Sequence, residues 1–555
     1  MVDFWPMRKN ALIPWLLAIL SAFLLLLPFS IAGPVPWWRT LFAWVALVPL
    51  LIAILDGTYV EAKRHLLRSA LLAYLTGVLW YLGNCYWIYQ TMFFYGGISA
   101  IASAGILLAY SLILGLYFAC FGLLVSLIAK SSRSIVHPLI AAPFLWVALE
   151  FAASRITSVP WDQLGYSQVD NYLLTGLATF TGVYGLSFLL VSAGSLLVSA
   201  LVNHAASLRY RVAVLGAGVC LIAVLGSGHF FPPPPQPTQA TAVLMQPNLS
   251  VKGNAAWDET LYDANVAEFS RLSKQTCGTY IGGLPETNAP AVVTPCTNSP
   301  AKTDLIAWPE APTAFHDIDP RFQEVMGRLA TETGASVIAG NVGIDTSADG
   351  FTIFNSAAVF SPQGSYIGRY DKIHLVPFGE YVPFKNLLFF AGHLTRNVSD
   401  FGRGEYRKVF RTGGHRYGVF ICYESIFADE IRHFAANGAE VFVNISDDGW
   451  YGETSAPWQH LNMARMRAIE NRRWILRDTN NGTTTIIDPY GRPTVSMQRN
   501  IRGSLAGRYG FRDDITFYTA HGDVFAMLCA IIAIGLSARA AKTVVLAPKM
   551  IFQNR

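Results

Sequence analysis

The fold class follows from one stretch of the chain, LIAVLGSGHFFPPPPQPTQATAVLMQ (residues 221–246). It begins inside an apolar run, 211–229, close to the roughly 20 residues that cross a bilayer as a helix. The prolines at 232–235 and 237 cannot continue a helix and are typical of a stiff, extended linker. The apolar run Ala240–Gln246 that follows has the length of a β-strand. The stretch therefore predicts the junction of a membrane domain and an α/β domain.

Charge is distributed unevenly about this junction. Only 14% of the 555 residues are charged, against about 25% in a typical soluble domain. Residues 1–230 hold 11 of the 41 Lys/Arg and 6 of the 36 Asp/Glu. This composition excludes a disordered chain and an ordinary soluble enzyme. The net charge of +5 comes without a basic cluster, so we expect no nucleic-acid partner.

Apolar runs of the required length predict eight membrane spans, at about 11–30, 40–56, 68–90, 98–129, 134–153, 177–202, 211–229 and 522–541. The first run follows Arg8 and Lys9 as a signal peptide would, but six further spans succeed it, which favours a retained anchor. The predicted domains are a membrane domain (1–230), a linker (231–238), an α/β domain (239–520) and a C-terminal span with its tail (521–555).

Loop charges predict the orientation. With a cytoplasmic N-terminus, the inner segments hold 13 Lys/Arg, whereas the short outer loops hold only Arg39 and Arg155. Lys and Arg concentrate on the cytoplasmic side of membrane proteins. We therefore predict that both termini are cytoplasmic and that the domain after the linker lies outside.

After the linker, short apolar runs alternate with polar helical stretches, which is typical of a layered α/β fold. The predicted strands are Ala240–Gln246, Leu305–Trp308, Ser336–Ala339, Ala357–Phe360, Tyr417–Ile421, Val441–Ile445 and Thr484–Ile487. The predicted helices are Trp257–Lys274, Arg321–Thr333, Ile426–Asn437 and Trp458–Arg472.

Three polar residues lie where apolar strands are expected to end. The ends of strands are where reactive groups of α/β folds collect. Glu310 follows Leu305–Trp308, Cys422 follows Tyr417–Ile421, and Lys372 lies between them in sequence. Singly, such a cysteine is most often a core residue and such charges are most often solvated. Together they can perform acyl transfer: a thiol needs a base at neutral pH, and the tetrahedral oxyanion needs a cation. Glu310 would be the base and Lys372 the cation, and the intermediate would be a thioester on Cys422.

The sequence contains no G-x-S-x-G, H-E-x-x-H, C-x-x-C or P-loop motif, which disfavours a serine hydrolase or a metal site. The order Glu-Lys-Cys, with Trp308-Pro309-Glu310 and Cys422-Tyr423-Glu424, instead resembles the nitrilase (carbon–nitrogen hydrolase) superfamily. More narrowly, the chain resembles the bacterial apolipoprotein N-acyltransferases at Asp371–Pro383, Pro457–His460, Met463–Ala468, Thr479–Gly482 and, in the membrane part, Pro160–Gln168. It departs from them at Asn444–Gly452 and at Trp474.

The resemblance implies an extracytoplasmic αββα sandwich joined to a multi-pass domain of the bacterial inner membrane. It also implies transfer of an acyl chain from a phospholipid to the N-terminal amine of a lipidated apolipoprotein, without a cofactor. Carried over by position, Cys422 would be the nucleophile, Glu310 the base and Lys372 the oxyanion partner. Residues that would support the site or bind substrate are Trp257, Glu380, Tyr423, Glu424 and Trp450.

Drawing a 16-carbon chain into water would cost about 12 kcal/mol, so the thiol must meet its lipid substrates at the bilayer. The apolar segment 376–394 either enters the lipid or packs on the sheet. Cys277 and Cys296 flank an inserted loop in a compartment where disulfides persist, so we predict a bridge between them. Glu150 in the membrane part is either structural or functional.

Two other function classes remain open. One is a membrane-tethered amidase or nitrilase that releases the acyl group to water, which the same three residues would serve. The other is a non-catalytic binding or transport protein, which the intact Glu310, Lys372 and Cys422 disfavour. Ammonia or free acid released from soluble amides would identify the first, and activity surviving Cys422→Ala the second.

Overall fold

The computed structural model describes residues 11–56, 62–202, 206–251, 259–274, 302–313, 315–347, 350–381 and 401–551. The chain forms two compact units. One comprises Met1–Tyr89, Ala100–Pro233 and His521–Arg555, and the other comprises Gln90–Ser99 and Pro234–Ala520. The second unit thus includes a short segment, Gln90–Ser99, that joins two predicted spans in the sequence.

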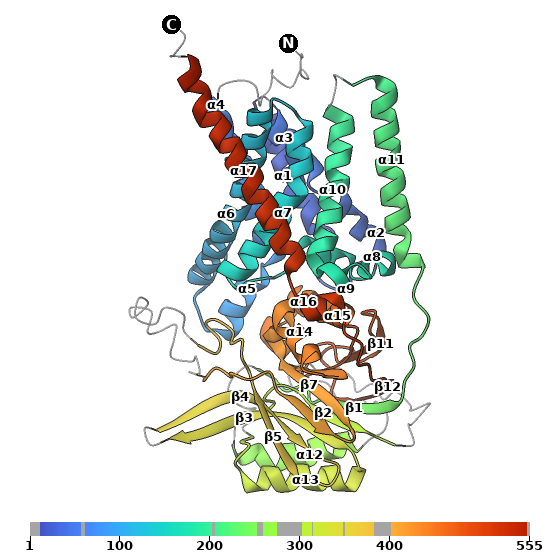
Figure 1. Cartoon of the computed structure of the whole chain (residues 1–555). Coiled ribbons are helices and arrows are strands. Elements are labelled where there is room, and N and C mark those ends of the chain that lie inside the picture. The colour runs from blue at the N-terminus through green and yellow to red at the C-terminus, as the bar shows by residue number, and fades with distance from the viewer. Residues whose placement is uncertain are drawn as a thin grey trace. The chain divides into compact units, whose positions relative to one another are not determined.

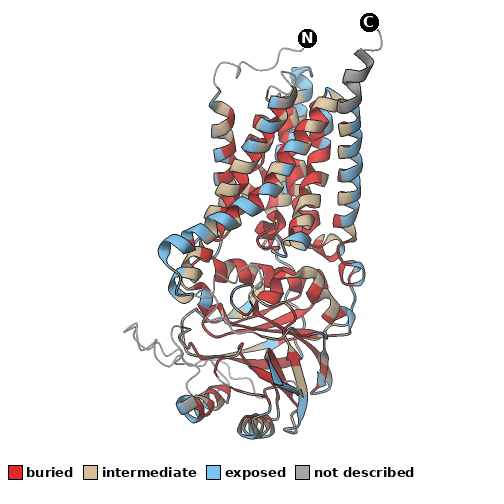
Figure 2. Ribbon diagram, turned by 90° about the vertical axis from the view of Figure 1, so that its left-hand side faces the viewer, coloured by how far each residue is buried: buried red, intermediate tan, exposed pale blue. Residues whose placement is uncertain are grey.

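The first unit is helical (Figure 1). Its longer helices are α1 (Ile13–Leu26), α3 (Val48–Leu55), α4 (Ala62–Asn84), α6 (Ala100–Ser132), α7 (Val136–Ile156), α10 (Val183–Val202), α11 (Leu208–Gly226) and α17 (Val524–Ile551). Buried and exposed positions alternate along them (Figure 2), and the exposed ones include large apolar side chains such as Ile113, Leu116 and Ile531. Apolar surface of this kind belongs in lipid.

Seven helical stretches among the described residues are long and apolar enough to cross a membrane: Trp37–Leu55, Arg64–Asn84, Ala100–Ser132, Val136–Ile156, Val183–Val202, Leu208–Phe230 and Val524–Val544. The chain is therefore a multi-pass membrane protein, and seven of the eight predicted spans correspond to these candidate spans. The remaining one corresponds to α1, which has 14 residues. At 1.5 Å per residue it rises about 21 Å, short of a hydrocarbon core of about 30 Å. The span at 11–30 therefore stays a prediction.

The second unit contains two six-stranded sheets, in the orders β12-β1-β2-β3-β4-β5 and β11-β10-β9-β8-β7-β6. Neighbours β1, β2 and β3 are parallel, as are β7, β8 and β9, and the outer pairs are antiparallel. The strands are β1 (Ala240–Gln246), β2 (Leu305–Trp308), β3 (Ser336–Ser347), β4 (Gly350–Phe360), β5 (Tyr366–Asp371), β6 (Val409–Thr412), β7 (His415–Ile421), β8 (Val441–Ser446), β9 (Trp474–Thr479), β10 (Thr485–Ile487), β11 (Pro493–Ser496) and β12 (Gly503–Tyr509).

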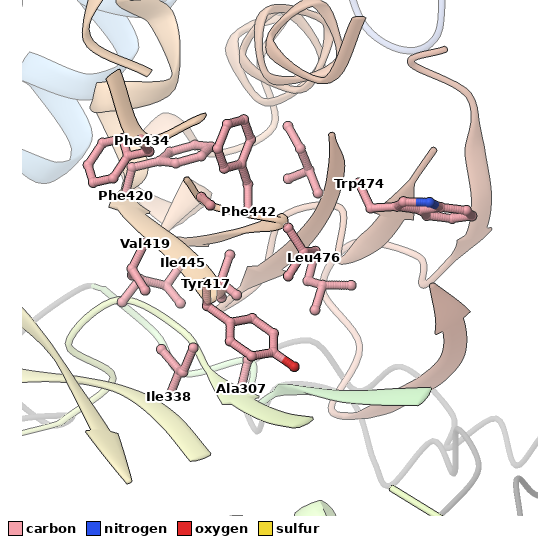
Figure 3. Close-up of a cluster of buried hydrophobic side chains, with 14 of the residues drawn as sticks. Ala307, Ile338, Tyr417, Val419, Phe420, Phe434, Phe442, Ile445, Trp474 and Leu476 are labelled. Atoms are coloured by element: carbon pink, nitrogen blue, oxygen red, sulfur yellow. The ribbon is translucent and has the colours of Figure 1, made fainter. Parts of the chain in front are cut away.

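The two sheets pack face to face, with helices on their outer faces. Ala307 and Ile338 of the first sheet share a buried apolar core with Val419 and Ile445 of the second (Figure 3). Helices α12 (Tyr262–Ser273) and α13 (Pro320–Thr333) pack on the first sheet, and α14 (Ala428–Ala436) and α15 (Ala456–Asn471) pack on the second. These four layers confirm the predicted αββα sandwich.

All seven predicted strands and all four predicted helices of this unit are present, and β3 and β4 are longer than predicted. Strands β5, β6, β9, β11 and β12 were not predicted. Strand β9 shows why: it is fully buried but carries Arg477 and Asp478, and such charges are rare inside a sheet sandwich.

Candidate active site

Glu310 lies two residues beyond β2, at the carboxyl end of a parallel strand. Its backbone passes closely over Gly340 in β3. A Cβ atom at Gly340 would lie 1.9 Å from the carbonyl oxygen of Pro309 and 2.7 Å from the backbone nitrogen of Ala311. Only glycine leaves room for this approach, so Gly340 allows the chain to carry Glu310 across the sheet edge.

Four buried polar side chains meet at this edge. The ammonium of Lys372, which directly follows β5, lies 2.9 Å from Oε1 of Glu310 and 2.9 Å from Oε1 of Glu380. The side-chain amide of Asn355 in β4 donates to the same two oxygens, at 2.7 Å and 2.6 Å. The second oxygen of Glu310 accepts the backbone N–H of Asp447 at 2.8 Å. The Glu310 carboxylate is therefore held at both of its oxygens.

Lys372 is a permanent cation in this site. Its side chain is 1% exposed, and burial alone lowers the pKa of a lysine. The carboxylates of Glu310 and Glu380 outweigh that effect, so the pKa of Lys372 lies well above its ordinary value. A fixed ammonium of this kind can stabilise an oxyanion that forms beside it.

Cys422 directly follows β7 and begins the short helix η9 (Cys422–Ile426). Its φ is +49°, in the left-handed region that residues other than glycine rarely adopt. Such strain persists only where the surrounding structure holds it, and it is common at active sites.

The side chain of Glu424 holds this strained turn. It is fully buried, and Oε2 accepts the backbone N–H of Ile421 at 2.7 Å. Oε1 accepts the hydroxyl of Tyr370 at 2.7 Å and the backbone N–H groups of Ile373 and the next residue at 2.7 Å and 3.1 Å. One carboxylate thus ties the cysteine turn to the segment that follows the lysine.

The thiol of Cys422 is protonated in the resting site. Burial raises the pKa of Cys422 well above its ordinary value, and the Glu310 carboxylate raises it further, whereas Lys372 opposes both. The Ser446 side chain also lowers the pKa of this thiol. Attack on a carbonyl therefore needs a base, and Glu310 is a carboxylate whose charge acts on this thiol.

A fully buried network supports Cys422 from behind. Nε2 of His460 lies 3.0 Å from the carbonyl oxygen of Cys422, and Nδ1 lies 3.0 Å from Oδ1 of Asp448. Arg477 donates to Asp448 at 2.9 Å, and so does the Ser446 hydroxyl at 3.0 Å. Burial tends to raise the pKa of Asp448, but Arg477 and His460 outweigh it and lower that pKa. Asp448 is therefore a carboxylate that anchors the network.

Two further predicted residues lie nearby in the same unit. Tyr423 is 8% exposed and adjoins Cys422 in η9, whereas Trp450 is 47% exposed. The carbonyl of Trp450 accepts the Thr91 hydroxyl at 3.1 Å, and the ring centroids of Trp450 and Tyr95 lie 6.4 Å apart. Both partners belong to the short π-helix η3 (Thr91–Tyr95), so the segment from between the predicted spans packs on the loop that adjoins Asp447.

The structure brings five of the predicted site residues together: Glu310, Lys372, Glu380, Cys422 and Glu424. Trp257, Cys277 and Cys296 fall outside the described residues. Sequence analysis missed Asn355 and His460. Asn355 stands out in the sequence only as a polar residue within an apolar run, and His460 only as the last residue of the Pro457–His460 motif. Neither pattern indicates what the side chain contacts.

The carbon-nitrogen hydrolase family matches residues 241–506, and the apolipoprotein N-acyltransferase N-terminal domain matches residues 21–196. The apolipoprotein N-acyltransferase of Geobacter metallireducens is 33% identical over 522 residues, which are 93% of this chain and 93% of that protein. The chain belongs to the apolipoprotein N-acyltransferase family.

Other members of the N-acyltransferase family are similar over most of their length. The protein of Methylococcus capsulatus is 30% identical, and the match covers 91% of this chain and 92% of that protein. The protein of Pseudomonas putida is 32% identical, and the match covers 84% of this chain and 87% of that protein. Among solved structures, a variant of the amidase from Nesterenkonia sp. AN1 is 17% identical and covers 53% of this chain and 97% of its own, with a TM-score of 0.35. Membership of the family makes this chain an enzyme, and the family matches include its helical unit.

Proposed function

We propose that the enzyme transfers an acyl group from a phospholipid to the N-terminal amine of the diacylglyceryl-cysteine of apolipoproteins, through a thioester on Cys422. The observation that carries this proposal is the Lys372 ammonium held 2.9 Å from both Glu310 and Glu380 beside a buried thiol. The relatives that share 30–33% identity are named for this reaction.

The first half-reaction acylates the thiol. As the sulfur of Cys422 attacks the ester carbonyl of the phospholipid, Glu310 takes the thiol proton, and the carbonyl oxygen becomes an oxyanion that Lys372 stabilises. The intermediate collapses by breaking the ester C–O bond. Glu310 returns the proton to the departing alkoxide, so that a lysophospholipid leaves and the acyl group stays on sulfur.

The second half-reaction uses the same groups in the reverse sense. Glu310 takes a proton from the acceptor amine as its nitrogen attacks the thioester carbonyl. The resulting oxyanion again faces Lys372, the C–S bond breaks, and the proton on Glu310 passes to the sulfur of Cys422. An amide has formed and the enzyme is restored, as a ping-pong cycle requires.

Both substrates are anchored in lipid, so we further propose that segment 376–394 contacts the bilayer. Its described part supports this, because the apolar side chain of Phe378 is 44% exposed. The remaining part lies outside the described residues. Replacing Leu388 and Phe389 with serine should slow turnover on membrane-bound substrate but not on short-chain soluble esters. Unchanged turnover on both substrates would contradict this placement.

The proposed topology places both termini in the cytoplasm and the domain at 239–520 in the periplasm, with membrane segments at 1–230 and 521–555 joined to it through 231–238. It rests on 13 Lys/Arg in the inner segments against two in the outer loops. Labelling of single surface cysteines by a membrane-impermeant maleimide in intact spheroplasts should modify the domain and spare the tail.

A product assay separates transfer from hydrolysis. The full-length enzyme in phospholipid vesicles is incubated with a diacylglyceryl peptide and a labelled donor phospholipid. The proposal expects the label on the peptide amine. Double-reciprocal plots of rate against peptide concentration, taken at several phospholipid concentrations, should be parallel. Label recovered only as free fatty acid would favour the membrane-tethered amidohydrolase.

A further inference from the structure

The segment Gln90–Ser99 belongs to the second unit, although it joins two predicted spans in the sequence. Its centre is the π-helix η3, which is closed by a hydrogen bond from the backbone N–H of Gly96 to the carbonyl of Thr91 at 3.0 Å. π-helices are uncommon, and they occur frequently at functional sites. The segment takes no part in the acyl-transfer chemistry described above, so the contacts that it makes indicate its role.

η3 packs on the loop Asp447–Gly452, which we call the base loop. The hydroxyl of Thr91 donates to the carbonyl of Trp450 at 3.1 Å, and the ring of Tyr95 meets the ring of Trp450 edge-on, with centroids 6.4 Å apart. A Cβ atom at Gly452 would lie 2.8 Å from the hydroxyl oxygen of Tyr95. η3 therefore contacts the end of the base loop through a hydrogen bond and through close packing.

The start of the base loop holds the proposed base. The backbone N–H of Asp447 donates to Oε2 of Glu310 at 2.8 Å. Within the loop, Oδ1 of Asp447 accepts the N–H of Gly449 at 2.9 Å, and the carbonyl of Gly449 accepts the N–H of Gly452 at 3.0 Å. These bonds join the two ends of the loop, so a shift at the end that contacts η3 displaces the N–H that holds Glu310.

The base loop also adjoins the nucleophile. Burial raises the pKa of Tyr451, and the charge of Cys422 is the next largest cause, so this tyrosine lies near the thiol. Asp448 reaches the carbonyl of Cys422 through the ring of His460. On the other side of the loop, Trp450 is 47% exposed. Burial alone therefore fixes that side poorly, and η3 supplies contacts there.

We propose that Thr91 and Tyr95 are positioning residues of the active site: they fix the base loop, and the loop holds Glu310 where it can take the proton of the Cys422 thiol. The inference rests on the proposed function, because it concerns the base of that reaction. Displacing a reacting group by about 1 Å lowers a rate by about 100-fold. Two side chains that touch neither substrate nor thiol thus control the rate of the chemical step.

The first test separates kcat from KM. The full-length enzyme in phospholipid vesicles is compared with Thr91→Val and Tyr95→Leu, and with the conservative variants Thr91→Ser and Tyr95→Phe. The matched control is Thr494→Val, because the hydroxyl of Thr494 in β11 also donates to a backbone carbonyl, that of Ile486, at 3.1 Å, but at one edge of the second sheet. Thermal unfolding is followed on the same preparations.

We expect Thr91→Val and Tyr95→Leu each to lower kcat about fivefold, the effect of about one neutral hydrogen bond on a barrier, with the KM for phospholipid unchanged. Thr91→Ser keeps the hydroxyl and Tyr95→Phe keeps the ring, so both should retain most of the wild-type kcat. Thr494→Val should keep the wild-type kcat at a similar midpoint of thermal unfolding. Unchanged kcat in both Thr91→Val and Tyr95→Leu, or loss in proportion to stability across all variants, overturns the proposal.

The second test asks whether η3 acts through the base. Alkylation of Cys422 by iodoacetamide also removes the thiol proton, and peptide mass spectrometry follows it in detergent without phospholipid. Thr91→Val should slow alkylation about fivefold in the wild-type background and leave it unchanged in a Glu310→Gln background. Equal slowing in both backgrounds overturns the proposal. Since alkylation needs no acyl donor, it decides the role of η3 even where an absent thioester refutes the proposed function.

Discussion

Glutamine in place of Glu424 should disable the enzyme while leaving it folded. The carboxylate accepts hydrogen bonds from Ile421, Tyr370, Ile373 and His374, whereas a glutamine has a single accepting oxygen. The favoured orientation keeps that oxygen on the three donors around Tyr370 and turns the NH₂ group toward the N–H of Ile421. One buried donor is then unsatisfied, which costs about 1–3 kcal/mol.

The loss falls on the turn that carries the nucleophile, because Ile421 directly precedes Cys422. Displacing a reacting atom by about 1 Å lowers a rate by about 100-fold. We therefore expect thioester formation by Glu424→Gln to slow by about two orders of magnitude, with a modest fall in the midpoint of thermal unfolding. The assay is rapid-quench measurement of hydroxylamine-sensitive acylation, with thermal unfolding followed on the same preparations.

The matched control is Asp488→Asn. Asp488 is also fully buried and also accepts backbone N–H groups, from Tyr490 at 2.9 Å and Arg492 at 3.0 Å, but its turn joins β10 and β11. Its replacement also removes an ion pair with Arg492 at 2.7 Å, so it should cost at least as much stability, and it should spare acylation. The reasoning is refuted if Glu424→Gln acylates at the wild-type rate, or if both variants lose activity in proportion to stability.

Three further outcomes are expected. Burial and the neighbouring Glu310 raise the pKa of Asp447 to about 7, above its unfolded value of about 3.9. The folded state then binds more protons between these values, so thermal stability should fall as the pH rises from about 4 to 7, and Asp447→Asn should flatten that dependence in melting curves. Asn355→Leu removes the amide shared by Glu310 and Glu380 and should lower kcat about tenfold with little change in the KM for phospholipid. Finally, Cys277 and Cys296 should resist alkylation until the protein is reduced, as peptide mass spectrometry would show, whereas alkylation before reduction would exclude the bridge.

The sequence predicted the layered fold because its core strands are short, apolar and well separated. Strands β1 and β2 match their predicted bounds, and both are buried along their whole length. Strand β9 was missed because Arg477 points into the buried network around Asp448, where its charge is compensated by residues from elsewhere in the chain. A local pattern cannot show that compensation, so β9 lacks the apolar signature of a core strand.

The reacting residues of the site could likewise be predicted from the sequence, but the contacts that hold them could not. Glu310, Lys372 and Cys422 have a recognisable order and context in the sequence. The contacts that prepare them do not, because Asn355, Glu424 and His460 contact partners between 3 and 54 positions away that only the folded chain brings together. In physical terms, the sequence indicates which groups can react, and the fold determines which groups hold them.

Intact-mass analysis of the full-length enzyme after incubation with phospholipid alone tests the central claim most directly. The account predicts one acyl group on the peptide that contains Cys422, removed by hydroxylamine, discharged by a diacylglyceryl peptide and absent from Cys422→Ala. An adduct on another residue, or full transfer activity in Cys422→Ala, would contradict it.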